Sequence, residues 1–202
     1  KLDGNLGRAT LVSTTSYADS DIVYSFDGDW GNEPYWGIYA PYQYFSLYDR
    51  QRGTLGQDLR ITSTATAHGE GIGWLAGAYA LRMDEDNLQR DYFVTSLINP
   101  PLDSTYEAVN LAAYGEIEWR VADAVTATGG LRVESHSADY HDSNGADFSP
   151  TNTMVGGHLS ITGEIESGST WYATLSRGYK AGGFNIGEYI PPDRLEFDPE
   201  YL

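Results

Sequence analysis

Cysteine is absent from this chain of 202 residues, and basic residues are scarce, with 12 lysines and arginines against 29 aspartates and glutamates and a formal net charge of -17. A chain without cysteine has no disulfide scaffold and no thiolate metal site. The deficit of positive charge argues against a nucleic-acid partner, whose phosphates require a basic surface. It also argues against attachment to anionic lipid through a basic patch. We therefore expect no nucleic-acid partner.

Long hydrophobic runs are missing as well. The longest is Trp74–Leu81, far short of the roughly 20 apolar residues that a membrane-spanning helix needs. The sequence starts at Lys1 and shows no signal peptide. We therefore expect no transmembrane helix, and we expect the chain to be a piece of a longer protein.

Alternation of apolar and polar residues with period two is the dominant pattern. For example, Val125, Leu131 and Val133 fall on one face of an extended chain, whereas Arg132 and Glu134 fall on the other. Helical spacing with capping residues is rare, so an all-β chain is expected. The alternation predicts about seven strands and the start of an eighth near Leu195, at 8–26, 44–63, 72–96, 105–121, 124–141, 152–165 and 169–184. Several are about twice the 5–6 residues usual for strands of soluble proteins.

The connections between these strands alternate in length. The long ones are "DGDWGNEPYWGIYAPYQ", "INPPLDST", "HDSNGADFSPTN" and "IGEYIPPDR", and the short ones are "TATAHGEG", "VADA" and "EIESGS". Transmembrane barrels have short turns at their periplasmic end and long loops at their extracellular end. The predicted fold class is therefore all-β, an antiparallel up-and-down meander that forms a section of a large transmembrane β-barrel.

A soluble β-sandwich is the alternative fold. Its polar face meets water, whereas the polar face of a barrel lines the lumen, and periodicity does not separate the two. Aromatic residues near the predicted strand ends favour the barrel, because tyrosine and tryptophan suit the boundary between lipid and water. Ordinary cross-strand packing is the other explanation for them. They include Tyr17, Tyr24, Phe26, Tyr48, Tyr92, Phe93 and Tyr140.

No catalytic or metal-binding pattern is strong. "GYKAGG" lacks both the spacing of a phosphate loop and a following helix. His136 and His141 would face opposite sides of a strand, and His68 and His158 have no close partner in the sequence. The acidic residues at 19–29 and 84–86 lack the calcium-loop pattern, although weak divalent-cation binding there stays open. We therefore expect no catalytic residue, no metal site and no cofactor.

The first long loop holds the densest group of aromatic residues in the chain. Such a loop is costly in water unless it packs on itself or meets a partner. Aromatic surfaces suit flat or sugar-like ligands. A self-packed cap and a substrate-binding surface are therefore both open. The residues of the second alternative are Trp30, Tyr35, Trp36, Tyr39, Tyr42 and Tyr44.

The stretch "YATLSRGYKAGGFN" closely resembles a strand of TonB-dependent outer-membrane receptors. The segments "GQDLRIT", "WLAGAYALRMDED", "NLAAYGEIEWRVADAVTATGGLRVE" and "RLEFDPEYL" are also similar to this family and occur in its order, so the resemblance covers most of the chain. It implies a structural role for the motif residues. These are Tyr172, Ser176, Arg177, Gly178, Tyr179, Lys180, Gly182, Gly183, Phe184 and Asn185.

This resemblance implies a receptor of the bacterial outer membrane, with a plug inside a barrel of roughly 22 strands. Its expected function is transport and not catalysis, namely binding of a scarce extracellular siderophore complex, cobalamin-like molecule or saccharide for TonB-driven uptake. The expected partners are that small-molecule or metal-chelate substrate, the TonB complex through the plug, and lipid with lipopolysaccharide. Residues 1–202 contain no plug, so we expect a middle section of the barrel. A soluble lectin-like module is the alternative function.

Overall fold

The computed structural model describes residues 1–64, 72–165, 168–185, 191 and 194–202. His68 lies outside the described residues, as does most of the expected connection at 186–194. Parts of the expected short turns at 64–71 and 164–169 lie outside them as well.

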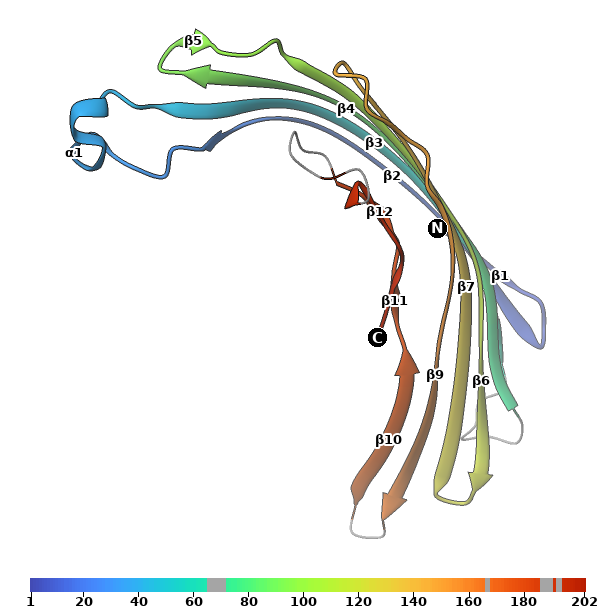
Figure 1. Cartoon of the computed structure of the whole chain (residues 1–202). Coiled ribbons are helices and arrows are strands. Elements are labelled where there is room, and N and C mark those ends of the chain that lie inside the picture. The colour runs from blue at the N-terminus through green and yellow to red at the C-terminus, as the bar shows by residue number, and fades with distance from the viewer. Residues whose placement is uncertain (65–71, 166–167, 186–190, 192–193) are drawn as a thin grey trace.

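One antiparallel sheet dominates the described residues (Figure 1). Its long strands follow one another in chain order, each paired with the next, so the predicted up-and-down meander is confirmed. These are β2 Ala9–Asp27, β3 Tyr44–Ser63, β4 Ile72–Phe93, β6 Leu102–Ala122, β7 Val125–Asp142, β9 Thr151–Ile165 and β10 Ser169–Arg177. Short strands pair at their margins, namely β1 Leu2–Asn5 with β2, β5 Ser96–Leu97 with β4, and β8 Asp147–Phe148 with β7.

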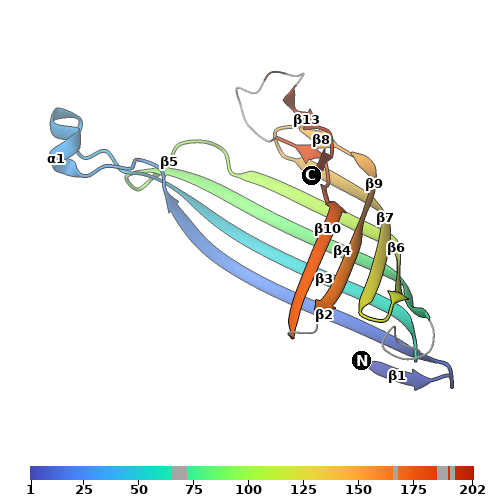
Figure 2. The ribbon, with the colours of Figure 1, turned by 90° about the horizontal axis from the view of Figure 1, so that it is seen from below.

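Short and long connections lie at opposite ends of the sheet (Figure 2). Residues 123–124 join β6 to β7, whereas the opposite end carries the long loops 28–43, 94–101 and 143–150. The loop at 28–43 contains α1 Glu33–Trp36 and the 3-10 turn η1 Gly37–Tyr39. The helices of the described residues are too short and too polar to cross a membrane. The alternation of short and long connections expected from the sequence therefore holds for the connections that the structure describes.

The long strands exceed the thickness of a bilayer. β2, β3, β4, β6 and β7 each contain 18 to 22 residues. At about 3.3 Å per residue they are roughly 60–70 Å long, whereas about 9–11 residues of a tilted strand cross the hydrocarbon layer. Half of each strand therefore extends beyond that layer.

The expected strand at 169–184 is wrong beyond Arg177. The chain bends there and continues as β11 Tyr179–Lys180 and β12 Gly183–Phe184. These pair with β14 Glu200–Tyr201 and β13 Glu196–Phe197, so the expected eighth strand is short and broken. Glycine permits this path, because a Cβ at Gly182 would lie 2.4 Å from the carbonyl oxygen of Phe197.

The outer face of the sheet is apolar and the inner face is polar, which is the reverse of the arrangement in a soluble protein. The convex face presents apolar side chains to the outside, among them Leu111, Leu131 and Leu159. The polar face is concave, and the segment containing β11 and β12 lies across it (Figure 1). Arg132 and Glu134 lie on this concave face, as the alternation predicted. An apolar exterior around a polar interior is the arrangement of a barrel wall in lipid.

The apolar part of the convex face forms a band toward the end with the short turns. Trp74, Trp119 and Trp171 are half-exposed at one margin of this band, where amphipathic rings suit the boundary between lipid and water. The cross-strand partners Tyr17 and Leu55 mark the other margin. Beyond them the convex face becomes acidic, with Asp19, Asp21, Asp49, Asp84 and Asp86.

The soluble-sandwich alternative is wrong for the described residues. A sandwich buries its apolar face against a second sheet, and no second sheet packs on the convex face of the part of the chain that is described. The two small sheets, β11 with β14 and β12 with β13, lie on the concave side (Figure 1).

Candidate functional site

The loop between β2 and β3 is held in shape at its base by local hydrogen bonds. The Asp29 carboxylate accepts one from the Gly31 amide at 2.9 Å and one from the Tyr44 amide at 3.1 Å. The Asn32 side chain caps α1 by accepting from the Tyr35 amide at 3.0 Å, which satisfies one free donor of the first helical turn. The sequence of this loop therefore specifies its own local fold.

Three of the six aromatic residues proposed from the sequence pack inside this loop. The ring centroids of Trp36 and Tyr42 are 4.3 Å apart, and Tyr42 meets Phe93 edge-on at 5.3 Å. The Tyr44 ring covers Gly28 so closely that a Cβ added to Gly28 would lie 2.5 Å from the ring. The self-packed alternative therefore describes Trp36, Tyr42 and Tyr44.

The other three aromatic residues of the loop are open to solvent, although the Trp30 ring meets Phe26 edge-on, with centroids 5.8 Å apart. Trp30 is 82% exposed, Tyr35 75% and Tyr39 72%. Ile38, which the sequence analysis missed, is 91% exposed between them in the chain. The feature that could have pointed to Ile38 is its position in the Gly-Ile-Tyr turn that follows α1. These four exposed side chains of the loop are together called the tip patch below.

The tip patch lies far from the apolar band. From Leu55, at the margin of the band, to Tyr44, at the end of β3, the strand extends for roughly 35 Å at about 3.3 Å per residue. Even with a tilt of about 45° this displacement exceeds the depth of one leaflet of a bilayer about 30 Å thick. Lipid therefore does not explain the exposed rings of the tip patch.

Tyr179 of the family motif connects the C-terminal crossing segment to the concave wall. Its hydroxyl donates to the Glu134 carboxylate at 2.7 Å and accepts from Arg132 Nε at 3.0 Å. Asn110 Nδ2 donates to the same carboxylate group at 2.7 Å. The ring crosses β9 at Gly156, where a Cβ would lie 2.7 Å from it. The Tyr179 side chain thus joins β11 to β7 across β9, and the close approach of its ring requires glycine at position 156.

Phe184 anchors the far end of the same segment. Its ring stacks on Phe148 with centroids 5.1 Å apart and lies 5.0 Å from the ring of Tyr140. Asn185 Nδ2 donates to the Arg194 carbonyl oxygen at 2.8 Å. The motif therefore holds the crossing segment at both ends.

The remaining motif residues are spread along the bend. The Arg177 guanidinium lies over the ring of Tyr201, 4.1 Å from its centroid. The Gly183 backbone is close enough to Phe197 that a Cβ would lie 2.9 Å from the ring. Tyr172 and Ser176 lie on the exposed strand β10. Gly178 is hydrogen-bonded through its backbone to Leu202, and Lys180 lies opposite Glu200 in the ladder of β11 with β14.

A charged cluster that was not predicted from the sequence lies on the concave wall. Arg50 and Arg52 of β3 both pair with Glu85 of β4. The signal was present in the alternation of "DRQRG", which places both arginines on one face. The partner could not be identified from the sequence, because it depends on the register of β3 against β4.

The acidic residues and histidines considered as metal ligands in the sequence do not lie together in the fold. Glu85 faces the concave side, whereas Asp84 and Asp86 face the convex side. His136 and His141 also take opposite faces, the former beside Asn110 and the latter near the short strand β8. Within the described ranges, no three histidine, aspartate or glutamate side chains form a candidate metal site.

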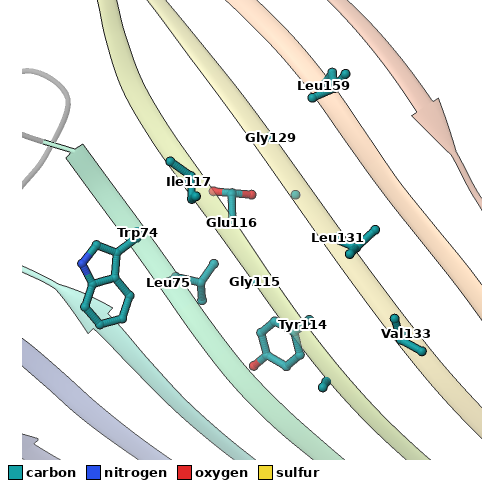
Figure 3. A pocket seen from close by; sticks show the side chains of 12 residues that line it. Trp74, Leu75, Tyr114, Gly115, Glu116, Ile117, Gly129, Leu131, Val133 and Leu159 are labelled. Atoms are coloured by element: carbon teal, nitrogen blue, oxygen red, sulfur yellow. The ribbon is translucent and has the colours of Figure 1, made fainter.

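An apolar groove of about 710 Å³ lies on the convex face, across β4, β6, β7 and β9 (Figure 3). Gly115 and Gly129 leave its floor open, and Ile117, Leu131 and Leu159 stand around it. It lies within the apolar band, and its lining is almost entirely apolar. The groove therefore belongs to the expected lipid-facing surface and is separate from the concave wall and the tip patch.

A curved meander with its apolar face outward is the wall of a transmembrane β-barrel, and comparison with known proteins identifies the family. The family "TonB dependent receptor-like, beta-barrel" matches residues 1–200. The chain therefore belongs to the TonB-dependent receptors, and the resemblance found in the sequence is confirmed. Members of this family reside in the bacterial outer membrane and are transporters, not enzymes.

Two solved structures share this fold. The ferric yersiniabactin uptake receptor FyuA from Yersinia pestis is 20% identical with a TM-score of 0.73, over 98% of this chain and 30% of that one. The copper transporter OprC is 20% identical with a TM-score of 0.58, over 86% of this chain and 28% of that one. The chain thus spans less than a third of either protein, and at this identity the likeness concerns the fold. None of the curated proteins matches the chain.

Proposed function

We propose that this chain belongs to an outer-membrane uptake receptor whose tip patch gathers the substrate at the extracellular mouth. One observation carries the proposal: four apolar side chains are 72–91% exposed on a loop whose base is folded and hydrogen-bonded. Exposed apolar surface on a structured support is typical of a binding site. Recognition must precede transport, and the tip patch lies at the long-loop end.

A metal chelate is the substrate class that the relatives favour. By their names, FyuA takes up a ferric siderophore and OprC transports copper. The exposed rings of Trp30, Tyr35 and Tyr39 suit the flat parts of such a chelate, because aromatic side chains stack on planar groups. Uptake would draw on the TonB complex, as in the family. Cobalamin-like molecules and saccharides remain competing substrates for the test.

The test uses cells that display the full-length receptor, with the double variant Trp30→Ala, Tyr39→Ala. The probes are radiolabelled iron(III) complexes of a tricatecholate and of a trihydroxamate, with cupric ion, cyanocobalamin and a maltooligosaccharide for the other classes. Each stacked ring contributes about 0.5–1.5 kcal/mol, so the affinity for the bound probe should fall roughly tenfold to a hundredfold. Both rings are exposed, so the amount of receptor at the surface should not change.

Tyr17→Ala is the matched control. Tyr17 lies on β2 and is 73% exposed, similar to the two replaced rings, but it lies at the apolar band, so its loss should leave affinity unchanged. If the double variant binds the probe with full affinity and is present at the surface in normal amount, the loop is a purely structural cap. Binding of none of the probes, or accumulation that is independent of TonB, would contradict the uptake function itself.

A further inference from the structure

Two arginines share one carboxylate on the concave wall. Arg52 Nε donates to Glu85 Oε2 at 2.6 Å, and Arg52 Nη2 pairs with the same oxygen. Arg50 Nε lies 3.3 Å from Glu85 Oε1. The Glu85 side chain is 14% exposed, against 30% for Arg50 and 40% for Arg52. The cluster therefore carries one net positive charge, and its cations are more accessible than its anion.

A stacked pair of tyrosines lies directly beside this cluster. The rings of Tyr24 and Tyr48 are 4.8 Å apart and nearly parallel, at 8°. Arg50 Nη2 donates to the Tyr24 hydroxyl at 2.9 Å. The wall thus combines guanidinium donors with aromatic surface on the same face, at the half of the sheet that ends in the long loops.

The hydrogen bonding of the cluster is incomplete. Arg50 Nε is buried and lies 3.3 Å from Glu85 Oε1 without making a well-directed hydrogen bond. Asn87, the cross-strand neighbour of Arg50, has a buried Oδ1 with no hydrogen-bond partner among the described residues. Buried polar groups are nearly always paired, so the hydrogen bonding of the concave wall is not satisfied at these two atoms by the described residues.

Three acidic residues around the cluster face the other way. Asp49, Asp84 and Asp86 adjoin the cluster in sequence, but strand alternation turns them to the convex face. The chain as a whole carries a formal charge of -17, yet near the cluster the concave face carries only Glu85 itself and Asp91, whose carboxylate accepts a hydrogen bond from Ser46. An anion approaching the concave wall here therefore meets the guanidinium groups first.

We propose that Arg50 and Arg52 form a subsite for an anionic group of the transported substrate, a carboxylate or phenolate oxygen of a metal chelate. Guanidinium groups bind such oxygens through paired, charge-assisted hydrogen bonds. Tyr24 and Tyr48 lie where a flat part of the same chelate can stack. Glu85 holds the arginines in place. This inference rests on the proposed uptake function and adds to it a preference for negatively charged substrates.

The experiment compares an anionic and a neutral probe on cells that display the full-length receptor. The anionic probe is the radiolabelled iron(III) tricatecholate complex, and the neutral probe is the iron(III) trihydroxamate complex. In the double variant Arg50→Gln, Arg52→Gln, the affinity for the anionic complex should fall about tenfold to a hundredfold through loss of charge-assisted hydrogen bonds. Any affinity for the neutral complex should change by less than about threefold.

Two single variants separate binding from structure. Arg82→Gln removes an arginine of β4 that pairs with Asp84 and Glu107 on the convex face, and it should leave the affinity for both probes unchanged. Glu85→Gln removes the shared negative charge but keeps an acceptor oxygen for the arginines, so it raises the positive charge of the cluster while still positioning Arg52. It should preserve or strengthen binding of the anionic complex, whereas a purely structural cluster would lose binding of both probes along with surface receptor.

Three results would overturn the subsite. They are equal weakening of both probes in the double arginine variant, undiminished affinity for the anionic complex at normal surface level, and a receptor that binds the neutral complex but not the anionic one. Failure of every probe, including cyanocobalamin, cupric ion and the maltooligosaccharide, would overturn the subsite and the uptake function together.

Discussion

Replacement of Leu131 by arginine tests which face of the sheet meets lipid. Leu131 lies within the apolar band on β7 and is 59% exposed on the convex face. Its cross-strand partners are Gly115 and Gly157, so a longer side chain fits without a clash and charge is the main change. An arginine facing lipid at mid-bilayer depth costs about 2–4 kcal/mol. This corresponds to roughly a 30- to 700-fold shift of the folding equilibrium in membranes.

Thr128→Arg is the matched control on the same strand. Thr128 lies on the concave face between its partners Glu118 and Ser160. A guanidinium there would have a carboxylate beside it and would not enter lipid. Substitutions of this kind usually change stability by no more than about 0.5 kcal/mol. Leu131→Met, a volume-conserving change that adds no charge, should cost less than about 1.5 kcal/mol.

The assay is urea unfolding of the full-length receptor in lipid vesicles, followed by tryptophan fluorescence, together with the folded yield in outer membranes. Leu131→Arg should lower the unfolding midpoint and the yield well below those of Thr128→Arg. Equal losses in the two arginine variants, or no loss in Leu131→Arg, would refute the assignment of the convex face to lipid.

Two further predictions concern close contacts made by aromatic rings, and both are read from the same urea midpoint. A Cβ at Gly163 would lie 2.3 Å from the ring of Trp171, so Gly163→Ala should displace the ring and cost about 1–3 kcal/mol. Gly53→Ala is its control, because a Cβ there meets nothing within 4 Å, and matching losses would show that ring contact is not the cause. Tyr179→Phe removes the hydrogen bond to Glu134 at 2.7 Å and should cost about 1.5–3 kcal/mol; an unchanged midpoint would mean that this bond does not hold the crossing segment.

The strands and their order could be predicted from the sequence because both depend on near neighbours. Alternation fixes which residues share a face, so Leu131 and Arg132 were separated correctly. A tight turn such as that at 123–124 leaves antiparallel pairing of β6 with β7 as the only short path. The family motif, a contiguous stretch, was equally readable and is confirmed by the family match.

The division of the aromatic loop depended on packing that the sequence does not show. Trp30 and Trp36 are equally apolar and lie in one short segment, yet one is open to solvent and the other packs on Tyr42. The difference comes from the cap at Asn32 and from Phe93, which belongs to another strand. Whether each ring belongs to the tip patch or to the loop base is therefore a tertiary property.

Strand patterning determined long strands with one apolar and one polar face, because a period of two is a property of each strand alone. Only the tertiary structure decided that the apolar face lies outside, where the wall turns inward and which charges meet. Tyr179 reaches Glu134 across 45 residues of chain, and this contact accompanies the bend after Arg177. Glu85 meets Arg52 across 33 residues. Such contacts depend on the register and curvature of the whole sheet, which no local pattern of residues encodes.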